Sequence, residues 1–343
     1  MGIQYDILAS TLRILRDREV DNTFRTIPLL EAVERLGNVE KVNGGQKVDH
    51  PVILAEHSNI TQLATGYESI NLAVKDALRT ASFDWCDFAA PVVITEKEQL
   101  SNKGERAIIR IAEARLKSVM GMLKREWCRQ VVKGDSSVLT DLNTFNGEGV
   151  VTTTPALGTG FFEIDTFGNQ SNVVGGISKS AFSQSWQNQV ADAGGAFGTN
   201  GLKAMSNLLI NTQIYAPEGQ VDIILASPTS YELYRDQLEA NERYTSAEQM
   251  KDLVGRMALM YNGAMMYIDQ NLGYQVNGSA DKISMFFLNS SLFTCYFDQD
   301  AFFEMGDMER ISGYAAASAN ILVRTQLATS HLAGHGVLIN GEN

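Results

Sequence analysis

Residues 105–133 read ERAIIRIAEARLKSVMGMLKREWCRQVVK, an unbroken helical pattern that decides the fold class of this chain. A helix of this length extends about 43 Å at a rise of about 1.5 Å per residue. Gly134 follows the pattern and is a typical helix terminator. Apolar residues that recur every three or four positions share one face of such a helix. They are Ile108, Ala112, Leu116, Val119 and Leu123, with Ile109 and Trp127 at the margins.

Two signals before this segment predict where the helix begins. Thr95 with Glu98, and Asn102 with Glu105, have the spacing of a capping box. In that motif the side chains at the two positions bond the free backbone N–H groups of the first turn. We therefore expect helical structure to begin between residue 96 and residue 105.

Cations gather on the side of the helix opposite the apolar stripe. They outnumber carboxylates between residues 103 and 133, whereas the whole chain has a formal net charge of −12. A solvated face paired with acidic neighbours is the ordinary explanation of such a run. The contrast with the overall charge favours a face turned toward nucleic acid or toward acidic patches on other subunits. The candidate residues are Lys103, Arg106, Arg110, Lys117 and Lys124, and Glu113 interrupts them.

The composition is that of a soluble, acidic protein with a packed core. The chain has 343 residues, of which 44% are hydrophobic, and three cysteines without a C-x-x-C spacing. So few cysteines favour a reducing compartment and argue against a disulfide scaffold or a zinc site. No apolar run approaches the roughly 18 residues of a membrane-spanning helix, and the first residues are too charged for a signal peptide. No membrane association is therefore expected.

The first part of the chain predicts an arm followed by a long two-stranded excursion. Residues 1–40 contain two short helical patterns separated by Pro28. The turn signal NGG at 43–45 precedes the extended segment VDHPVILAE, and the aromatic and β-branched residues 79–95 form the next strand. An isolated pair of strands is only marginally stable in water. It needs a surface to lie on, and we expect that surface to be another subunit.

The remaining chain mixes helices, strands and glycine-rich loops. Ser227 and Pro228 have the spacing of an N-cap and a first helical residue after a buried strand. The break at 289–291 predicts that the strands on either side of it form a hairpin. The expected helices are 178–194, 201–215 and 228 to about 238, and the expected strands or extended segments are 221–226, 264–270, 283–289, 292–298 and 319–339.

No cluster of residues indicates catalysis or metal binding. His331 and His335 have the spacing of a metal pair on a helix, but they lie in an extended pattern without a third ligand. The stretch LGTGFF at 157–162 lacks the third glycine of a phosphate-binding loop. Ser227 follows a strand without the G-x-S-x-G context of a nucleophile, so a helix cap explains it better. We expect no catalytic residue, no cofactor and no metal.

The order and spacing of these parts resembles the major capsid proteins of tailed bacteriophages (Caudovirales), which have the Hong Kong 97 fold. The resemblance covers the chain from about residue 3 to about residue 339 and implies an α+β fold whose long helix is the spine of an L-shaped subunit. The stretches that carry it are GGQKVDHPVILAEHSNITQLATGY, RTASFDWCDFAAPVVIT, EQLSNKGERAIIRIAEARL, VGGISKSAFSQSWQNQV, VDIILASPTSYELYRDQLEANERY and MMYIDQNL followed by ISMFFLNSSLFTCYF.

The resemblance also implies a division of the chain and a set of crosslinking candidates. Some members of the family crosslink through a lysine of the extended loop, and Lys41, Lys47 and Lys75 lie in or near that loop here. Nothing in their spacing selects one, so no crosslinking is expected. The implied segments are an N-terminal arm at 1–40, an extended loop at 41–82, a peripheral-domain strand and spine helix at 83–134, an axial domain at 135–298 and a C-terminal return to the peripheral domain at 299–343.

The function implied by the resemblance is structural and not enzymatic. Copies would self-assemble into hexamers and pentamers of an icosahedral capsid, the head of a virion, around double-stranded DNA bound without sequence specificity. Assembly would take place in the host cytoplasm with a portal and a separate scaffolding protein, and decoration proteins are further candidate partners. The basic residues of the helix would face the lumen or a neighbouring subunit. An encapsulin-like shell around a protein cargo is the alternative, and a soluble enzyme or a DNA-binding protein are the other classes considered.

Overall fold

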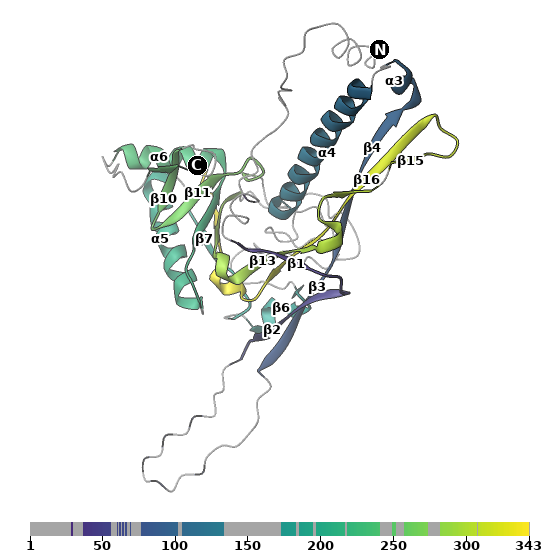
Figure 1. Cartoon of the computed structure of the whole chain (residues 1–343). Coiled ribbons are helices and arrows are strands. Elements are labelled where there is room, and N and C mark those ends of the chain that lie inside the picture. Colours follow the sequence, from purple (N-terminus) through teal and green to yellow (C-terminus); the bar gives the residue numbers. More distant parts are fainter. Residues whose placement is uncertain are drawn as a thin grey trace, which may run out of the picture.

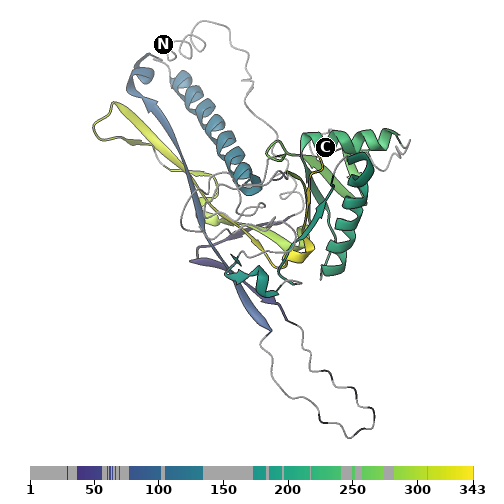
Figure 2. The same cartoon turned by 180° about the vertical axis from the view of Figure 1, so that it is seen from behind.

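The structure is a computed structural model with a six-stranded sheet beside one long helix, a separate seven-stranded sheet and a hairpin extending from one end (Figures 1 and 2). The seven-stranded sheet and its two helices lie to one side of the long helix. The structure describes residues 29, 37–55, 60, 62, 64, 66, 69, 77–101, 105–133, 173–182, 185–194, 197–216, 218–240, 249–251, 257–273, 282–306 and 308–342.

The long helix predicted over residues 105–133 is confirmed as α4 (Glu105–Lys133), preceded by α3 (Glu96–Ser101). The first capping box forms, since the backbone N–H of Thr95 donates to the Glu98 carboxylate at 3.1 Å. Leu123 and Trp127, from the predicted apolar face, are buried in the main core.

A six-stranded sheet lies against this helix, and its central element is the 14-residue strand β16. On β4, Val92 and Ile94 are buried whereas Pro91 and Val93 are exposed, so one face of the strand is turned to the core. Val92 belongs to the same core cluster as Leu123 of the helix. The strands are β1 (Val39–Val42), β4 (Cys86–Thr95), β13 (Phe293–Asp298), β14 (Glu304–Met305), β15 (Glu309–Arg310) and β16 (Ala316–Thr329).

The second sheet has seven strands in the order β7-β17-β12-β8-β11-β10-β9. One face packs against α5 (Phe197–Tyr215) and α6 (Pro228–Ala240), which form a core of their own. Residues of the opposite face, among them Leu225 and Phe286, share the core that contains Trp127 of α4. The strands are β7 (Gln189–Asp192), β8 (Ile223–Ala226), β9 (Gln249–Lys251), β10 (Met257–Tyr261), β11 (Ala264–Ile268), β12 (Ile283–Leu288) and β17 (Gly336–Ile339).

The hairpin predicted from residues 283–298 is wrong, because β12 lies in the seven-stranded sheet and β13 in the six-stranded sheet. The break between them is a single 3-10 turn, Ser290–Leu292, fixed by polar bonds to another part of the chain. The Asn289 side chain donates to the Glu218 carbonyl at 2.9 Å, and the backbone N–H of Ser290 donates to Asp222 at 2.8 Å. These bonds redirect the chain from one sheet to the other.

The helix predicted at 178–194 is also wrong. The described residues there form a 3-10 turn, Lys179–Phe182, and the strand β7 (Gln189–Asp192), and the turn follows the short hairpin of β5 (Val173–Val174) and β6 (Ile177–Ser178). Trp186 is fully buried and its indole N–H donates to the carbonyl of Val174 at 3.2 Å. The apolar residues that suggested a helix instead anchor a turn beneath this hairpin, and the chain then continues into β7.

The strand predicted at 79–95 is divided at Trp85 into β3 (Leu78–Asp84) and β4, which belong to different sheets. Other expectations fall largely or wholly outside the described residues, namely the two helices of the N-terminal arm, the tip of the extended loop and the glycine-containing stretch at 157–162. The predicted strands near 221–226 and 264–270, the helix after Ser227 and the extended segments at 319–339 are confirmed.

Candidate functional site

The hairpin of β2 (Lys47–Ile53) and β3 projects from the body, as Figures 1 and 2 show. At its root Val48 and Phe83 are directly opposite each other and both are buried in the main core. At its far end Ile53 and Leu78 are also directly opposite each other, but they are 71% and 62% exposed. The hairpin is therefore anchored at one end and presents an apolar cross-strand pair to the outside at the other.

A second exposed apolar surface lies on the sheet beside the long helix. Leu322 of β16 is directly opposite Ala89 of β4, and Pro91 and Val93 lie two and four positions further along the same face. All four residues are exposed. Val92, whose side chain points the other way, is buried with the long helix, so this face is turned away from it. We call it the outer face of β4–β16.

The hairpin between β15 and β16 is a second projection and carries the third exposed apolar surface (Figure 1). Tyr314 at its turn is 75% exposed, and Met308 just before β15 is exposed as well. Arg310 forms an ion pair with Glu96 at the start of α3, so this hairpin is tied to the beginning of the helical region. The two projecting hairpins and the outer face of β4–β16 all expose apolar side chains to water in the single subunit. Such surfaces are suited to burial against other chains.

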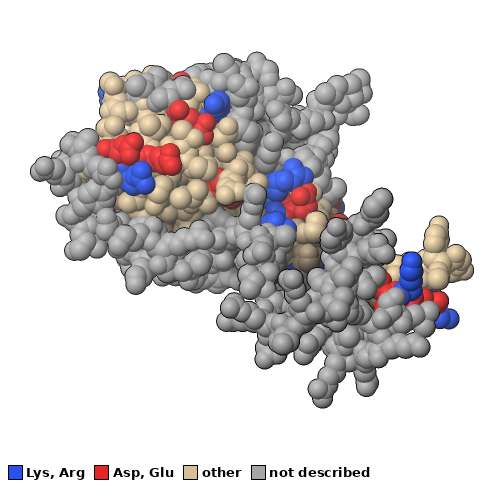
Figure 3. Space-filling model, turned by 90° about the horizontal axis from the view of Figure 1, so that it is seen from above, with Lys and Arg blue, Asp and Glu red and all other residues tan. Residues whose placement is uncertain are grey.

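The basic residues predicted along the long helical segment are only partly described. Lys117 is exposed, and the ammonium group of Lys124 lies 5.4 Å from the ring centre of Phe303. The side chains of Lys103, Arg106 and Arg110 lie outside the described residues. In Figure 3, blue (Lys and Arg) and red (Asp and Glu) groups adjoin each other on the described surface, which is otherwise mostly tan. The lumen-facing or inter-subunit role of these five cations stays a prediction.

Two of the three lysines considered for crosslinking have contacts within the subunit. Lys47 pairs with Asp84 at 2.9 Å across the root of the hairpin, and Lys41 lies 3.8 Å from the ring centre of Phe302. Lys75 lies outside the described residues. The expectation that these lysines do not crosslink remains untested.

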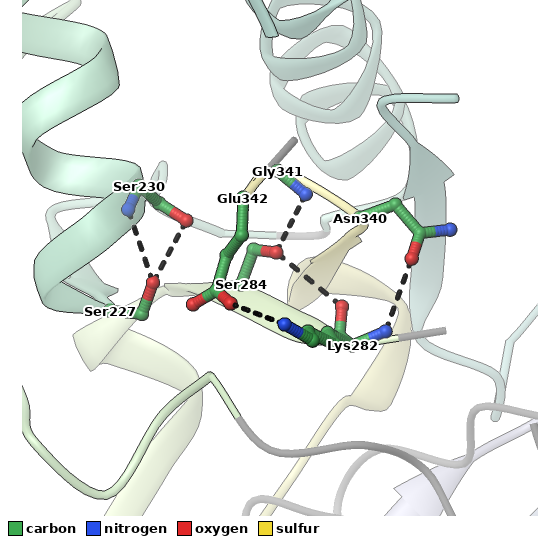
Figure 4. Close-up of polar contacts among 7 residues, drawn as sticks. All are labelled: Ser227, Ser230, Lys282, Ser284, Asn340, Gly341 and Glu342. Atoms are coloured by element: carbon green, nitrogen blue, oxygen red, sulfur yellow. Dashed lines mark hydrogen bonds and ion pairs between the residues drawn. The ribbon is translucent and has the colours of Figure 1, made fainter. Parts of the chain in front are cut away.

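The residues considered for chemistry have structural roles. Ser227 is buried, accepts a hydrogen bond from the backbone N–H of Ser230 at 3.2 Å and donates to its hydroxyl at 2.9 Å, which is the predicted N-cap (Figure 4). In the same region the backbone N–H of Gly341 donates to the Ser284 hydroxyl at 2.7 Å. The bond from Gly341 fastens the last described residues to β12, an interior strand of the seven-stranded sheet.

The two histidines considered as metal ligands have hydrogen-bonding contacts of their own within the subunit. His335 is fully buried, and its Nδ1 accepts from the backbone N–H of Asn289 at 3.3 Å. Burial lowers the pKa of His335 to about 3, with the charge of His331 as a second cause, so the ring is neutral. The Nε2 of His331 lies 2.8 Å from the carbonyl of Tyr215. Among the described residues there is no group of three metal-ligating side chains, and no described helix is long and apolar enough to cross a membrane.

Sequence reasoning identified the hairpin but not the apolar pairs that it and the sheet expose. The alternation of buried and exposed residues along 86–95 contained a signal for the outer face, since Pro91 and Val93 had to point away from the buried Val92. That Ile53 and Leu78 meet across the hairpin depends on its register, which the long intervening loop concealed.

Comparison with solved structures places the whole chain in one group of folds. It matches a structure of the cyanophage A-1(L) capsid asymmetric unit with a TM-score of 0.59 and 16% identity, covering 96% of this chain and 98% of that chain. It matches the holo-SrpI encapsulin complex of Synechococcus elongatus PCC 7942 with a TM-score of 0.56 and 12% identity, covering 97% and 94% of the two chains. The α+β capsid fold expected from the sequence is confirmed.

A third match is the capsid of a native GTA particle, with a TM-score of 0.53 and 12% identity over 96% of this chain and 95% of that chain. No protein-family model matches the sequence. No curated protein matches it significantly. The likeness therefore concerns the fold and extends over almost the full length of the chain.

Proposed function

We propose that this chain, which has the Hong Kong 97-type capsid fold, is a major capsid protein whose copies assemble into a closed icosahedral shell. The observation that carries the proposal is the projecting hairpin with Ile53 and Leu78 exposed at its end. Burying apolar area stabilises association by about 25 cal/mol per Å². A hairpin held only at its root gains this energy by lying on another copy.

The outer face of β4–β16 is the surface that fits this hairpin in a neighbouring copy. It presents Pro91, Val93 and Leu322 in one exposed strip, and it is long enough to receive an extended pair of strands. The contact is between different surfaces of the two copies, and a contact of this kind gives closed rings when the rotation between copies closes. Hexamers and pentamers of one chain are the expected rings, and many simultaneous contacts make the loss of a subunit from a complete shell rare.

The division of the chain proposed for this assembly keeps the boundaries expected from the sequence, with an N-terminal arm at 1–40, an extended loop at 41–82, a peripheral domain at 83–134 and 299–343 and an axial domain at 135–298. Strands β13 and β17 differ from that simple division. β13, from the proposed axial segment, lies in the six-stranded sheet with β4 and β16. β17, from the proposed C-terminal return, lies in the seven-stranded sheet. The chain therefore passes between the two domains more often than the linear division implies.

The proposed content of the shell is double-stranded DNA. The cations Lys103, Arg106, Arg110, Lys117 and Lys124 are proposed to face the lumen or a neighbouring subunit. The proposed partners are a separate scaffolding protein, a portal and decoration proteins, with assembly in the host cytoplasm and the virion as the final location. An encapsulin-like shell around protein cargo is the second candidate, because the SrpI encapsulin is among the matching structures. The nucleic acid and protein content of purified particles distinguishes the two.

The test of the hairpin uses a double charge substitution, Ile53→Asp with Leu78→Asp. We expect a folded subunit, with unchanged circular dichroism, that forms no shells in electron micrographs. The matched control is Ile53→Val with Leu78→Ile, which keeps the pair apolar and should assemble. Deleting residues 44–78 should also prevent assembly, but it removes Val48 and Val52 from the core and so is the coarser experiment. Normal particles from the double Asp variant would contradict the proposal.

A further inference from the structure

One histidine side chain packs between the root of the projecting hairpin and the six-stranded sheet, and we call this contact the joint. His50 of β2 is half-buried, and its ring centre lies 5.6 Å from that of Tyr296 on β13 and 6.4 Å from that of Phe83 on β3. Within the described part of the chain its Nε2 is enclosed without a hydrogen-bonding partner. The imidazole is therefore a wedge between the hairpin and the sheet of the body.

Two carboxylates stand close to this ring. Asp49 neighbours His50 on β2 and accepts a hydrogen bond from the Ser82 hydroxyl at 2.5 Å. Glu40 on β1 is directly opposite Tyr296 and is hydrogen-bonded to its side chain. Both carboxylates raise the pKa of His50, but burial is the larger effect and leaves that pKa below its ordinary value. The ring is thus neutral when packed, and it takes up a proton more readily when water reaches it.

The other charged groups near the joint are already paired. Lys47 pairs with Asp84 at the end of the root, and Arg324 of β16 pairs with Asp87 and lies over the Trp85 ring at 5.3 Å. Lys41, next to Glu40 on β1, lies 3.8 Å from the ring centre of Phe302. From β16 the uncharged Gln326 side chain bonds the backbone of the hairpin at Asp84.

We infer that His50 is a pH-sensitive joint that holds the hairpin at a fixed angle when neutral and releases it when protonated. An imidazolium between Tyr296 and Phe83 has lost most of its hydration, so the protonated ring favours a position nearer to water and to Glu40. Core residues such as Val48 keep the hairpin attached, so its root loosens without detaching. The significance of this motion for shell formation rests on the proposed function, whereas the joint itself belongs to the single subunit.

The experiment measures the angle of the hairpin in the unassembled subunit. Spin labels are placed at Leu78 on the hairpin and at Ser118 on α4, both of which are exposed, while the three native cysteines are buried. Pulsed electron resonance then records the distance distribution at about pH 7.5 and at about pH 5.5, on either side of the ordinary histidine pKa. We expect a broader distribution at the lower pH in the wild-type chain and no change with pH in His50→Gln.

His331→Gln is the matched control, because His331 is also a half-buried histidine but contacts the carbonyl of Tyr215 at the end of α5. It should keep the wild-type pH response. Should His50→Gln fail to fold, Glu40→Gln tests the same idea, since loss of that carboxylate should move the midpoint of the response to lower pH. A wild-type distance distribution that does not change with pH overturns the inference about His50. A pH response that persists in His50→Gln overturns it too, and so does an unchanged midpoint in Glu40→Gln. Shell assembly is scored separately with the Ile53 and Leu78 variants, so either idea can fail alone.

Discussion

Gly175 lies directly against Ala81, and a Cβ built on this glycine would stand 2.9 Å from the Cβ of Ala81. The backbone N–H of Ser82 donates to the carbonyl of Gly175 at 2.9 Å. The turn of the β5–β6 hairpin is therefore pressed onto β3 at the root of the projecting hairpin. A residue far along the chain thus helps to fix where the hairpin leaves the body.

Gly175→Ala should destabilise the subunit. Its φ of +58° is in the left-handed region, and the new methyl group would overlap Ala81. Gly176→Ala is the control, because it has a similar φ of +78° but nothing within 4 Å of the added atom. We expect a loss of about 1 kcal/mol for Gly176→Ala and of about 2–4 kcal/mol for Gly175→Ala in urea unfolding. Equal losses would mean that the contact with Ala81 does not matter.

His335 should make stability depend on pH. In the unfolded chain its pKa is about 6.5, whereas burial lowers it to about 3 in the folded protein. Below about pH 6.5 the unfolded state therefore binds a proton that the folded state excludes, and the folded state loses up to about 1.4 kcal/mol per pH unit until about pH 3.

The measurement compares urea unfolding of the wild type with that of His335→Gln between about pH 7.5 and about pH 4. The variant loses bonds at neutral pH and should be less stable there, but the gap should shrink as the pH falls because glutamine does not titrate. His331→Gln, at a half-buried position, should show a smaller change with pH. A gap that stays constant for His335→Gln would contradict the buried neutral ring.

The pair of Glu98 and Arg115 should stabilise the packing of α3 against α4. The Arg115 guanidinium bonds both oxygens of Glu98, at 2.5 and 3.0 Å, and this bonding lowers the pKa of Glu98 to about 2. Its contribution is present above the ordinary pKa of about 4.5 and is lost as the pH falls toward about 2. Glu98→Gln should lower the free energy of unfolding by about 1 kcal/mol at neutral pH.

Glu126→Gln is the matched control for that pair, since Glu126 forms an ion pair with Arg129 within α4 and is more exposed than Glu98. We expect a loss of at most about 0.5 kcal/mol for this variant. Calorimetry of both variants should therefore give a larger decrease in melting temperature for Glu98→Gln. The reverse order would contradict the larger contribution of the Glu98–Arg115 pair.

Trp127 should be the side chain whose truncation affects the subunit most. It is 1% exposed, it lies 5.9 Å from the Phe297 ring, and its core includes residues of both sheets. Trp127→Ala should cost about 3–5 kcal/mol because the cavity cannot close. Trp127→Phe should cost much less, because among the described residues the indole N–H has no hydrogen-bonding partner to lose. Similar losses in both variants would point to a partner for that N–H.

Local signals in the sequence were enough for the elements that depend on near neighbours. The helix at 105–133 follows from apolar spacing, a capping box and a terminal glycine, all within one segment. The helix after Ser227 follows from the cap and from Pro228, which the structure places at the first helical position. In both cases the information lies within a few residues of the feature that it determines.

Features that depend on distant residues were not predictable from such signals. The turn at 289–291 has the composition of a hairpin, and only the bonds to Glu218 and Asp222 redirect it between sheets. Trp186 lies in a helical spacing but bonds the carbonyl of Val174. The exposed pair at Ile53 and Leu78 likewise depends on a register set across a long loop.

The place of β17 in the seven-stranded sheet has a consequence for how the subunit is made. β17 lies between β7 and β12, so β7 is joined to the other strands only through a segment that the ribosome synthesises after every other described strand. A nascent chain cannot close this sheet until that segment has left the exit tunnel. Prematurely terminated chains would keep two open strand edges and should be removed by quality control before they are incorporated among complete copies.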